Sequence, residues 1–289
     1  MSGGGWLRGG QAVAVLSFDI DAESPILASG RRFADHAMTM THQAYGPLVG
    51  VPRILQLLKD YGLRATFFTP GFTADRYPQV VESVLQAGHE VAHHSYSHRL
   101  QTGMSPEHQE EDFRRGLDAL QKLGARPKGY RAPLWEATWR MPSMLVRNDF
   151  IYDSSLMDDD KPYVLEVDGK QLVELPPHWS LDDWEQYAYL PDPNIGSMIE
   201  SPNKVFDMWS HELESMRRHH CLFMLCCHPF LTGRPGRIEM MRRLIEFILE
   251  KRDVKICTAE EVAREALTDS SVPRRRLRPV DVPIDVYPD

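Results

Sequence analysis

Cysteine is scarce in this sequence, and long apolar runs are missing. The chain has 4 cysteines among 289 residues, and none of them forms a Cys-x-x-Cys pair. This argues against a disulfide framework and a zinc knuckle, and it fits buried, reduced thiols. No stretch approaches the ~20 apolar residues of a membrane helix, and the first ten residues lack the apolar centre of a signal peptide. We therefore expect a cytoplasmic protein without a membrane-spanning segment.

Basic residues are in the minority. The chain has 33 Lys and Arg against 41 Asp and Glu, and its formal net charge is -8. Binding to a phosphate backbone relies on clustered Lys and Arg, so we expect no nucleic-acid partner. What the chain does have is core material, with 42% hydrophobic residues that include 6 Trp, 10 Tyr and 11 Phe. This composition excludes a disordered chain.

Strand and helix candidates alternate along the chain. Two strand candidates, Ala12–Asp19 and Cys221–His228, are nearly continuous apolar runs, as expected of strands covered on both faces in a parallel sheet. Seven or eight strand–helix units without a linker predict one parallel α/β barrel over residues 1–270, and a doubly wound open sheet is the alternative. The other strand candidates are Arg64–Pro70, His89–His94, Lys128–Pro133, Tyr152–Leu156, Val173–Pro176 and Val254–Cys257.

Two long segments and the C-terminus depart from this rhythm. Glu23–Gly50 has weak periodicity, and Met157–Glu200 is interrupted only by the short strand candidate at Val173. We expect both to be long irregular loops that act as lids, because such loops on a compact scaffold are often functional. The Pro- and Arg-rich tail, residues 271–289, is expected to be an extended arm or disordered.

The first strand ends in two aspartates. Asp19 and Asp21 are separated by Ile20, and side chains alternate along a strand, so both carboxylates point to the same side. Two carboxylates at the end of a buried strand need compensation, which a cation commonly provides. The alternative is that Asp21 caps the following loop and Asp19 only marks the end of the strand.

Four histidines occur within eleven residues, and two of them match a protease pattern. His89 to His93 reads H-E-x-x-H, which binds zinc only when both histidines share one face of a helix. Gly88 ends the preceding helix, and the sequence continues like a strand. The longer metzincin pattern also fails, because Tyr96 and Arg99 occupy its glycine and third histidine positions. A zinc protease therefore remains only as an alternative.

The other two histidines, His94 and His98, fit a different metal site. A strand that ends at His94 and enters a turn brings His98 back beside it. Two imidazoles and one carboxylate are a ligand set that catalytic zinc uses, with one position left open. The alternative is that these histidines lie in a loop and face water.

Two further residues end strand candidates. Arg131 can hold a carboxylate through bidentate hydrogen bonds, although it can equally neutralise a surface acid. His228 ends the most apolar strand of the chain, where an imidazole is either structurally hydrogen-bonded or poised as an acid or base. Together with the aspartates and the other histidines, these residues favour catalysis.

These motifs resemble those of the polysaccharide deacetylase superfamily, also called the NodB-homology family. The resemblance runs from about Ala12 to Leu267. Its motifs appear in order as Ser17-Phe18-Asp19, His94-Ser95-Tyr96-Ser97-His98, Arg131-Ala132-Pro133, Asp153-Ser154-Ser155 and His228. In one departure, Ile20 separates two aspartates that are usually adjacent. This spacing is similar to that of a subgroup of candidate peptidoglycan deacetylases and cyclic imide hydrolases, and more distantly to metal-independent allantoinases.

The resemblance implies a distorted, TIM-like (β/α) barrel of about seven parallel strands and a metal-dependent hydrolysis of non-peptide C–N bonds. Asp21, His94 and His98 would hold a divalent metal, with Zn²⁺ the expected ion. Asp19 would be the general base, Arg131 its orienting partner and His228 the general acid. We expect the substrate to contact Pro133, Trp135 and Trp179.

Two substrate classes follow from this assignment. The first is an N-acetylated sugar, and the alternative is a small cyclic imide or allantoin-like ring. Long loops with Trp179, Trp184 and Tyr187 would suit a small, enclosed substrate. Such loops can also be completed by a neighbouring subunit, so a homo-oligomer is compatible with the sequence.

Overall fold

A mostly parallel β-sheet organises the computed structural model, which describes residues 12–282. The strand order is β10-β6-β7-β5-β4-β3-β2-β1-β8, and β9 pairs with the first half of β1. The strands are β1 (Ala12–Asp19), β2 (Thr66–Thr69), β3 (Glu90–His93), β4 (Gly129–Tyr130), β5 (Tyr152–Asp153), β6 (Tyr163–Val167), β7 (Lys170–Glu174), β8 (Leu222–Cys227), β9 (Val254–Cys257) and β10 (Arg274–Arg275).

The strand order is that of a barrel. From β1 to β5 each strand pairs with the one before it, and β8 returns to the other side of β1. The segment after β7 then reaches β8, where Asp182 and Cys226 form a parallel bridge. This bridge connects the segment that follows β7 to β8. The predicted α/β barrel is confirmed, and the strand order is not the reversing order of a doubly wound sheet.

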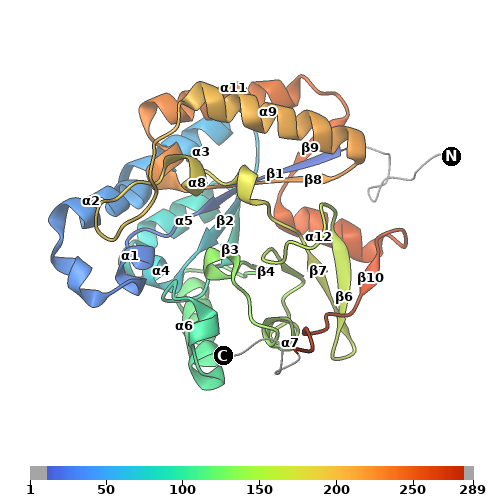
Figure 1. Ribbon diagram of the computed structural model, residues 1–289. Coiled ribbons are helices and arrows are strands. Elements are labelled where there is room, and N and C mark those ends of the chain that lie inside the picture. Colours follow the sequence, from blue (N-terminus) through green and yellow to red (C-terminus); the bar gives the residue numbers. More distant parts are fainter. Residues whose placement is uncertain (1–11, 283–289) are drawn as a thin grey trace.

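Helices cover the outer face of the sheet, and α9 and α11 lie side by side along one flank (Figure 1). The helices are α1 (Ser24–Ala28), α2 (Ala37–Tyr45), α3 (Val51–Asp60), α4 (Gly71–Arg76), α5 (Pro78–Gln86), α6 (Pro106–Lys122), α7 (Met141–Arg147), α8 (Trp184–Tyr187), α9 (Pro202–His219), α10 (Pro229–Thr232), α11 (Pro235–Leu249) and α12 (Ala259–Thr268). None of the helices in residues 12–282 is long and apolar enough to cross a membrane.

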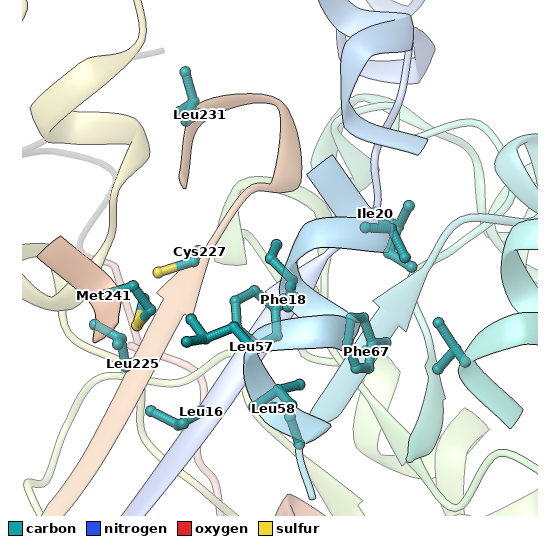
Figure 2. Packing of buried hydrophobic residues seen from close by; sticks show 14 of the residues in the cluster. Leu16, Phe18, Ile20, Leu57, Leu58, Phe67, Leu225, Cys227, Leu231 and Met241 are labelled. Carbon is teal, nitrogen blue, oxygen red and sulfur yellow. The ribbon is translucent and has the colours of Figure 1, made fainter. Parts of the chain in front are cut away.

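Strand β1 divides the core into an outer and an inner part. Leu16 and Phe18 pack with helix residues such as Leu57 in the outer cluster (Figure 2). Val13 and Val15 belong to the inner cluster, together with residues of β2, β5, β7 and β8. Because side chains alternate along a strand, the inner face continues through Ser17 to Asp19. The register of β1 therefore directs the first aspartate toward the inside of the barrel.

The segment Glu23–Gly50 is not irregular as expected. It contains α1, α2, a 3₁₀ helix at Arg31–Asp35 and a π-helical turn at Gly46–Gly50. Its helices are short and carry few buried residues, which explains the weak sequence periodicity. The segment docks tightly, since a Cβ on Gly50 would lie 2.1 Å from the carbonyl oxygen of Pro229. It therefore packs directly against the start of α10, the helix that follows β8.

The segment Met157–Glu200 is also more regular than expected. It contains the antiparallel hairpin β6–β7, a 3₁₀ helix at Trp179–Leu181 and α8. The predicted strand Val173–Pro176 is replaced by β7, which starts earlier. The hairpin turn is Asp168-Gly169, and both residues have positive φ, as a type I′ turn requires. This Asp-Gly pair was the sequence signal for the hairpin.

The first part of the C-terminal tail is ordered against the sheet. Arg274–Arg275 forms β10, which pairs in parallel with β6, so this part of the tail is an extended arm. The boundary at residue 270 between the barrel and the tail stays a prediction. All four cysteines are buried and unpaired.

Candidate active site

Asp21 lies at the barrel mouth, at the end of β1. The side chain is buried, and neither Oδ1 nor Oδ2 has a hydrogen-bond partner among the described residues. Its backbone carbonyl accepts hydrogen bonds from the hydroxyls of Thr73 and Ser24, at 3.0 and 2.8 Å. The backbone is therefore fixed while the buried carboxylate stays unpaired. A carboxylate in this situation is costly unless a cation or a charged partner compensates it.

His94 and His98 face this carboxylate from the end of β3. The Nε2 atom of His94 lies 3.6 Å from Asp21 Oδ1, and that of His98 lies 3.3 Å from Asp21 Oδ2. The turn between them places Ser95 and His98 at positive φ, and Ser95 Oγ accepts a hydrogen bond from the backbone N–H of His98. Asp112 on α6 accepts from the two intervening backbone N–H groups. The loop is thus held in the conformation that pairs the two rings.

The Nδ1 atom of His94 has a backbone hydrogen-bond partner, which determines the tautomer of the ring. Its Nδ1 lies 2.7 Å from the backbone carbonyl of Arg131, so Nδ1 donates and Nε2 keeps its lone pair toward Asp21. Burial lowers the pKa of His94, against the opposing effect of Asp19 and Asp21. Burial would raise the pKa of Asp21, but the nearby histidines hold it below its usual range. A neutral imidazole and an ionised carboxylate are the ligand forms that a metal needs.

Asp21, His94 and His98 fit a divalent metal. Their ligand atoms lie within 4.8 Å of one another, and all three residues are buried. Two other groups in residues 12–282 have similar spacing, namely Asp19 with Cys226 and His228, and Asp182 with Asp183 and His228. Both share His228 and contain carboxylates already engaged in hydrogen bonds. The unpaired Asp21 carboxylate therefore distinguishes the first group.

Asp19 is held by Arg131. The guanidinium Nη1 donates to Asp19 Oδ1 at 2.6 Å and to Ser17 Oγ at 3.1 Å. Arg131 is fully buried, and its guanidinium lies 3.9 Å above the ring of Phe68. The other carboxylate oxygen, Oδ2, lies 3.8 Å from His94 Nε2. Arg131 thus orients Asp19 through one oxygen and leaves the second facing the ligand cluster.

His228 follows β8 and is held by a residue that sequence reasoning missed. Its Nδ1 lies 2.8 Å from Asp183 Oδ1, which also accepts from the His228 backbone N–H, and Thr232 donates to the other oxygen of Asp183. Asp182 lies 3.5 Å from the same Nδ1. Burial would lower the pKa of His228, but Asp182 and Asp183 raise it to about 10. Its Nε2 lies 3.5 Å from Asp21 Oδ2 and faces the cluster.

The protease alternative is wrong. His89 and His93 lie at the start and end of the β3 region and not on a helix. His93 is buried against Phe113 and Tyr130, and its Nε2 lies 2.9 Å from the Phe113 carbonyl. One residue along the strand, His94 points the opposite way, into the site. The strand register decides which histidine is structural.

The motif Asp153-Ser154-Ser155 is hydrogen-bonded to the backbone next to Arg131. Ser155 Oγ donates to Asp153 Oδ1 and accepts from the backbone N–H of Ala132, at 2.7 and 2.9 Å. Glu174 pairs with Asp153 across β5 and β7 and accepts from the backbone N–H of Ser155 at 2.9 Å. Burial raises the pKa of Asp153 to about 7, despite the lowering effect of these hydrogen bonds and of Arg131. The structure therefore contains a buried carboxyl group that is protonated in mildly acidic solution.

The raised pKa of Asp153 makes the free energy of unfolding depend on pH. Folded Asp153 keeps its proton up to about pH 7, whereas an unfolded Asp has lost it above 3.8. The folded state binds more protons in this range, so Asp153 lowers the free energy of unfolding as pH rises through it, by at most about 1.4 kcal/mol per pH unit. We expect Asp153→Asn, which cannot titrate, to gain stability relative to the parent from pH 5 to 7. Urea unfolding at several pH values measures this.

The control for that experiment is Asp118→Asn, which changes a carboxylate on α6 whose side chain is 45% exposed and pairs with Arg114. Its difference from the parent should stay nearly constant with pH. Parallel stability curves for Asp153→Asn and the parent would contradict the raised pKa.

A small pocket opens over the ligand cluster. Its volume is about 120 Å³, and it is partly open to solvent. Its apolar lining consists of three tryptophans together with Ala132 and Leu134; the tryptophans are Trp135, Trp179 and Trp184. The substrate contacts predicted for Trp135 and Trp179 are compatible with this placement. Pro133 is buried between Ala132 and Leu134 and does not line the pocket.

Comparisons with known proteins agree with these motifs. Residues 35–143 match the family model of the polysaccharide deacetylases. A peptidoglycan deacetylase of Helicobacter pylori is 30% identical over 247 residues, which cover 76% of this chain and 84% of the relative. The chain belongs to the polysaccharide deacetylase family.

Two further relatives extend this assignment. A peptidoglycan deacetylase-like protein of Gibberella zeae is 28% identical, with 90% of this chain and 87% of the relative aligned. The crystal structure of a candidate polysaccharide deacetylase from Mycobacterium smegmatis is 43% identical, with a TM-score of 0.91 over 94% of this chain and 96% of that one. The family membership supports a deacetylase of the polysaccharide or peptidoglycan type, which is a hydrolase of amide bonds.

The fold is shared more widely than the sequence. The crystal structure of an allantoinase has a TM-score of 0.76 at 21% identity and covers 89% of this chain and 91% of that one. Such a likeness concerns the barrel and not the reaction.

Proposed function

We propose that this protein is a metal-dependent hydrolase that removes acetyl groups from N-acetylated sugars. The observation that carries the proposal is the buried cluster of Asp21, His94 and His98, in which both carboxylate oxygens of Asp21 lack a hydrogen-bond partner within residues 12–282. Two further groups border the cluster, namely the Asp19 carboxylate, which accepts from Arg131, and the His228 imidazole, which is hydrogen-bonded to Asp183. This is the set of groups that amide hydrolysis needs.

The reaction has two proton requirements. An amide carbon is a weak electrophile and an amine is a poor leaving group, so one group must take a proton from water and another must protonate nitrogen. A divalent metal held by Asp21, His94 and His98, with Zn²⁺ the expected ion, supplies an acidified water and polarises the acetyl carbonyl when bound.

Asp19 and His228 are the two groups that can meet these requirements. Asp19 accepts from Arg131 through Oδ1 and has Oδ2 free toward the cluster, so it can take the proton of the attacking water. His228 engages Asp183 through Nδ1 and presents Nε2, which can donate a proton to the leaving nitrogen. The products are acetate and a free amine, and both groups return to their starting protonation by exchange with solvent.

Cyclic imide hydrolysis is the second candidate, and the pocket has room for its substrate. A volume of about 120 Å³ walled by tryptophan rings holds roughly ten water-sized groups. That space suits an acetamido group, and it also suits the ring of a small imide.

One assay separates the two candidates. The zinc-loaded protein is offered N-acetylglucosamine oligomers, with acetate release as the readout, and succinimide or phthalimide, with ring opening as the readout. We expect acetate release. Imide opening without acetate would replace the sugar deacetylase by the imide hydrolase.

A further inference from the structure

A buried pair of carboxyl groups has no role in the proposed reaction. Asp153 and Glu174 lie opposite each other on the paired strands β5 and β7, and both side chains are fully buried. The two side chains are hydrogen-bonded to each other. Two carboxylates in such a place cannot both be ionised, because each disfavours the charge of the other and water is excluded. The pair therefore holds at least one proton.

The hydrogen bonds around the pair locate this proton. Asp153 Oδ1 accepts from the Ser154 backbone N–H and from the Ser155 hydroxyl. Glu174 Oε1 accepts from the backbone N–H groups of Ser155 and Leu156. The remaining oxygens, Asp153 Oδ2 and Glu174 Oε2, are buried and receive no hydrogen bond from any amide, hydroxyl or basic group in the described part of the chain. The proton thus lies between these two oxygens.

Glu174 is the residue that keeps this proton. Burial and the charge of Asp153 raise the pKa of Glu174 well above its usual range, whereas the pKa of Asp153 is raised only to about 7. Above pH 7, Glu174 therefore donates to the ionised Asp153 carboxylate.

Ser155 connects the pair to the site. Its hydroxyl donates to Asp153 at 2.7 Å and accepts from the backbone N–H of Ala132 at 2.9 Å. This N–H belongs to the same peptide group as the carbonyl of Arg131, and that carbonyl lies 2.7 Å from Nδ1 of His94. Because a peptide group is planar and rigid, a shift of Ser155 is passed on to the His94 ring.

The guanidinium of Arg131 depends on the same segment. Its Nη2 donates to Ser154 Oγ at 3.3 Å, and its Nη1 donates to Asp19 at 2.6 Å. Its Nε has no acceptor among residues 12–282. A displaced Ser154 would therefore let the guanidinium turn relative to the Asp19 carboxylate.

We propose that Glu174 is a positioning residue, which fixes Asp153 and Ser155 through its protonated carboxyl and thereby sets the positions of His94 and Asp19. The inference rests on the proposed function for what His94 and Asp19 do. Residues behind a metal ligand typically change metal affinity or activity by 10- to 100-fold. Glu174 acts through intervening groups, so we expect an effect at the lower end of this range, about tenfold.

The test compares two substitutions of Glu174. Glu174→Gln keeps an oxygen that accepts from the backbone and gains an N–H₂ group that donates to Asp153, whereas Glu174→Met has similar length and can do neither. Above pH 7, we expect Glu174→Met to bind zinc about tenfold more weakly in a chelator competition. At saturating zinc its kcat for acetate release should be about tenfold lower, with KM nearly unchanged. Glu174→Gln should behave like the parent.

The control is Glu166→Met on β6, the strand that pairs with β7. Glu166 is exposed and pairs with Arg276 at the surface, so this variant should match the parent in zinc affinity and kcat. Parental values in Glu174→Met would overturn the proposal, as would an equal loss in Glu174→Gln. A residue that contributes only to stability would lower the melting temperature and leave kcat and zinc affinity of the folded protein unchanged.

A second variant covers the case in which Glu174→Met does not fold. Ser155→Ala deletes the hydroxyl that joins Asp153 to the N–H of Ala132. About tenfold losses in zinc affinity and kcat are expected here as well, and parental values would overturn the proposal. Infrared difference spectra between the parent and Glu174→Gln report the proton itself. The C=O stretching band of a protonated carboxyl should be present in the parent and lost in the variant, and its absence from the parent would also overturn the proposal.

Zinc affinity separates this inference from the proposed function, because it needs no substrate. If the parent releases no acetate but Glu174→Met alone weakens zinc binding, the deacetylase proposal fails and the positioning role stands. If acetate is released and all variants match the parent, the deacetylase proposal stands and the positioning role fails. A parent that binds no zinc overturns both.

Discussion

Replacing His94 or His98 by alanine is expected to remove the bound metal and to lower activity by more than about 100-fold. The loss should exceed the 10- to 100-fold that is typical when only a residue behind a metal ligand is changed. Each variant removes one of the three ligands themselves and leaves only Asp21 and one histidine. Zinc content, measured by mass spectrometry on the purified variants, and the rate of acetate release are the two readouts.

The chain offers a matched control for these variants. His108 lies on α6 and is exposed, so His108→Ala should keep both zinc and activity. The ligand variants should remain folded, because ligands at a barrel mouth contribute to function more than to stability. Stoichiometric zinc in both His94→Ala and His98→Ala would refute the site. A melting temperature far below that of the metal-free parent would indicate a structural role instead.

Asp19→Asn is expected to keep the metal and to lose turnover by about 10²- to 10⁴-fold, the usual contribution of a positioned general base. The amide retains an oxygen that can accept from Arg131, but it cannot take a proton. Arg131 is buried and would lose its charged partner, so the melting temperature should also fall. Zinc content is therefore the readout that separates a lost base from a lost site.

Asp118→Asn on the exposed face of α6 is the control for this variant and should match the parent in rate and zinc content. A near-normal rate in Asp19→Asn would remove Asp19 as the base. Loss of zinc in Asp19→Asn would instead mean that this carboxylate helps to hold the metal.

Much of the site was readable from the sequence because its signals are local. The apolar run of β1, its period-2 alternation and the spacing of Asp19 and Asp21 together predict two carboxylates at one end of a buried strand. The pair His94 and His98 follows the same logic, because a strand end and a short turn bring the two rings together. These distances depend on a few residues of backbone geometry, which the sequence of the segment itself determines.

Other parts of the site required the tertiary structure. Asp183 is 45 residues from His228 along the chain, and nothing local distinguishes it from other acids in its segment. It reaches the imidazole because the chain after β7 returns to β8 through the bridge between Asp182 and Cys226. The regular structure inside Glu23–Gly50 was also missed, since it depends on close docking of Gly50 against Pro229 and not on an amphipathic pattern.

The sequence by itself determined the barrel, the family motifs and the order of the ligand and catalytic candidates along the chain. These features arise from hydrophobic periodicity and short-range geometry, both of which are written in neighbouring residues. Only the tertiary structure decided which carboxylate holds His228 and which histidine of the cluster is buried as a core residue. Those outcomes come from packing between segments that are far apart in the chain, where a small change in strand register or loop path changes which side chains meet.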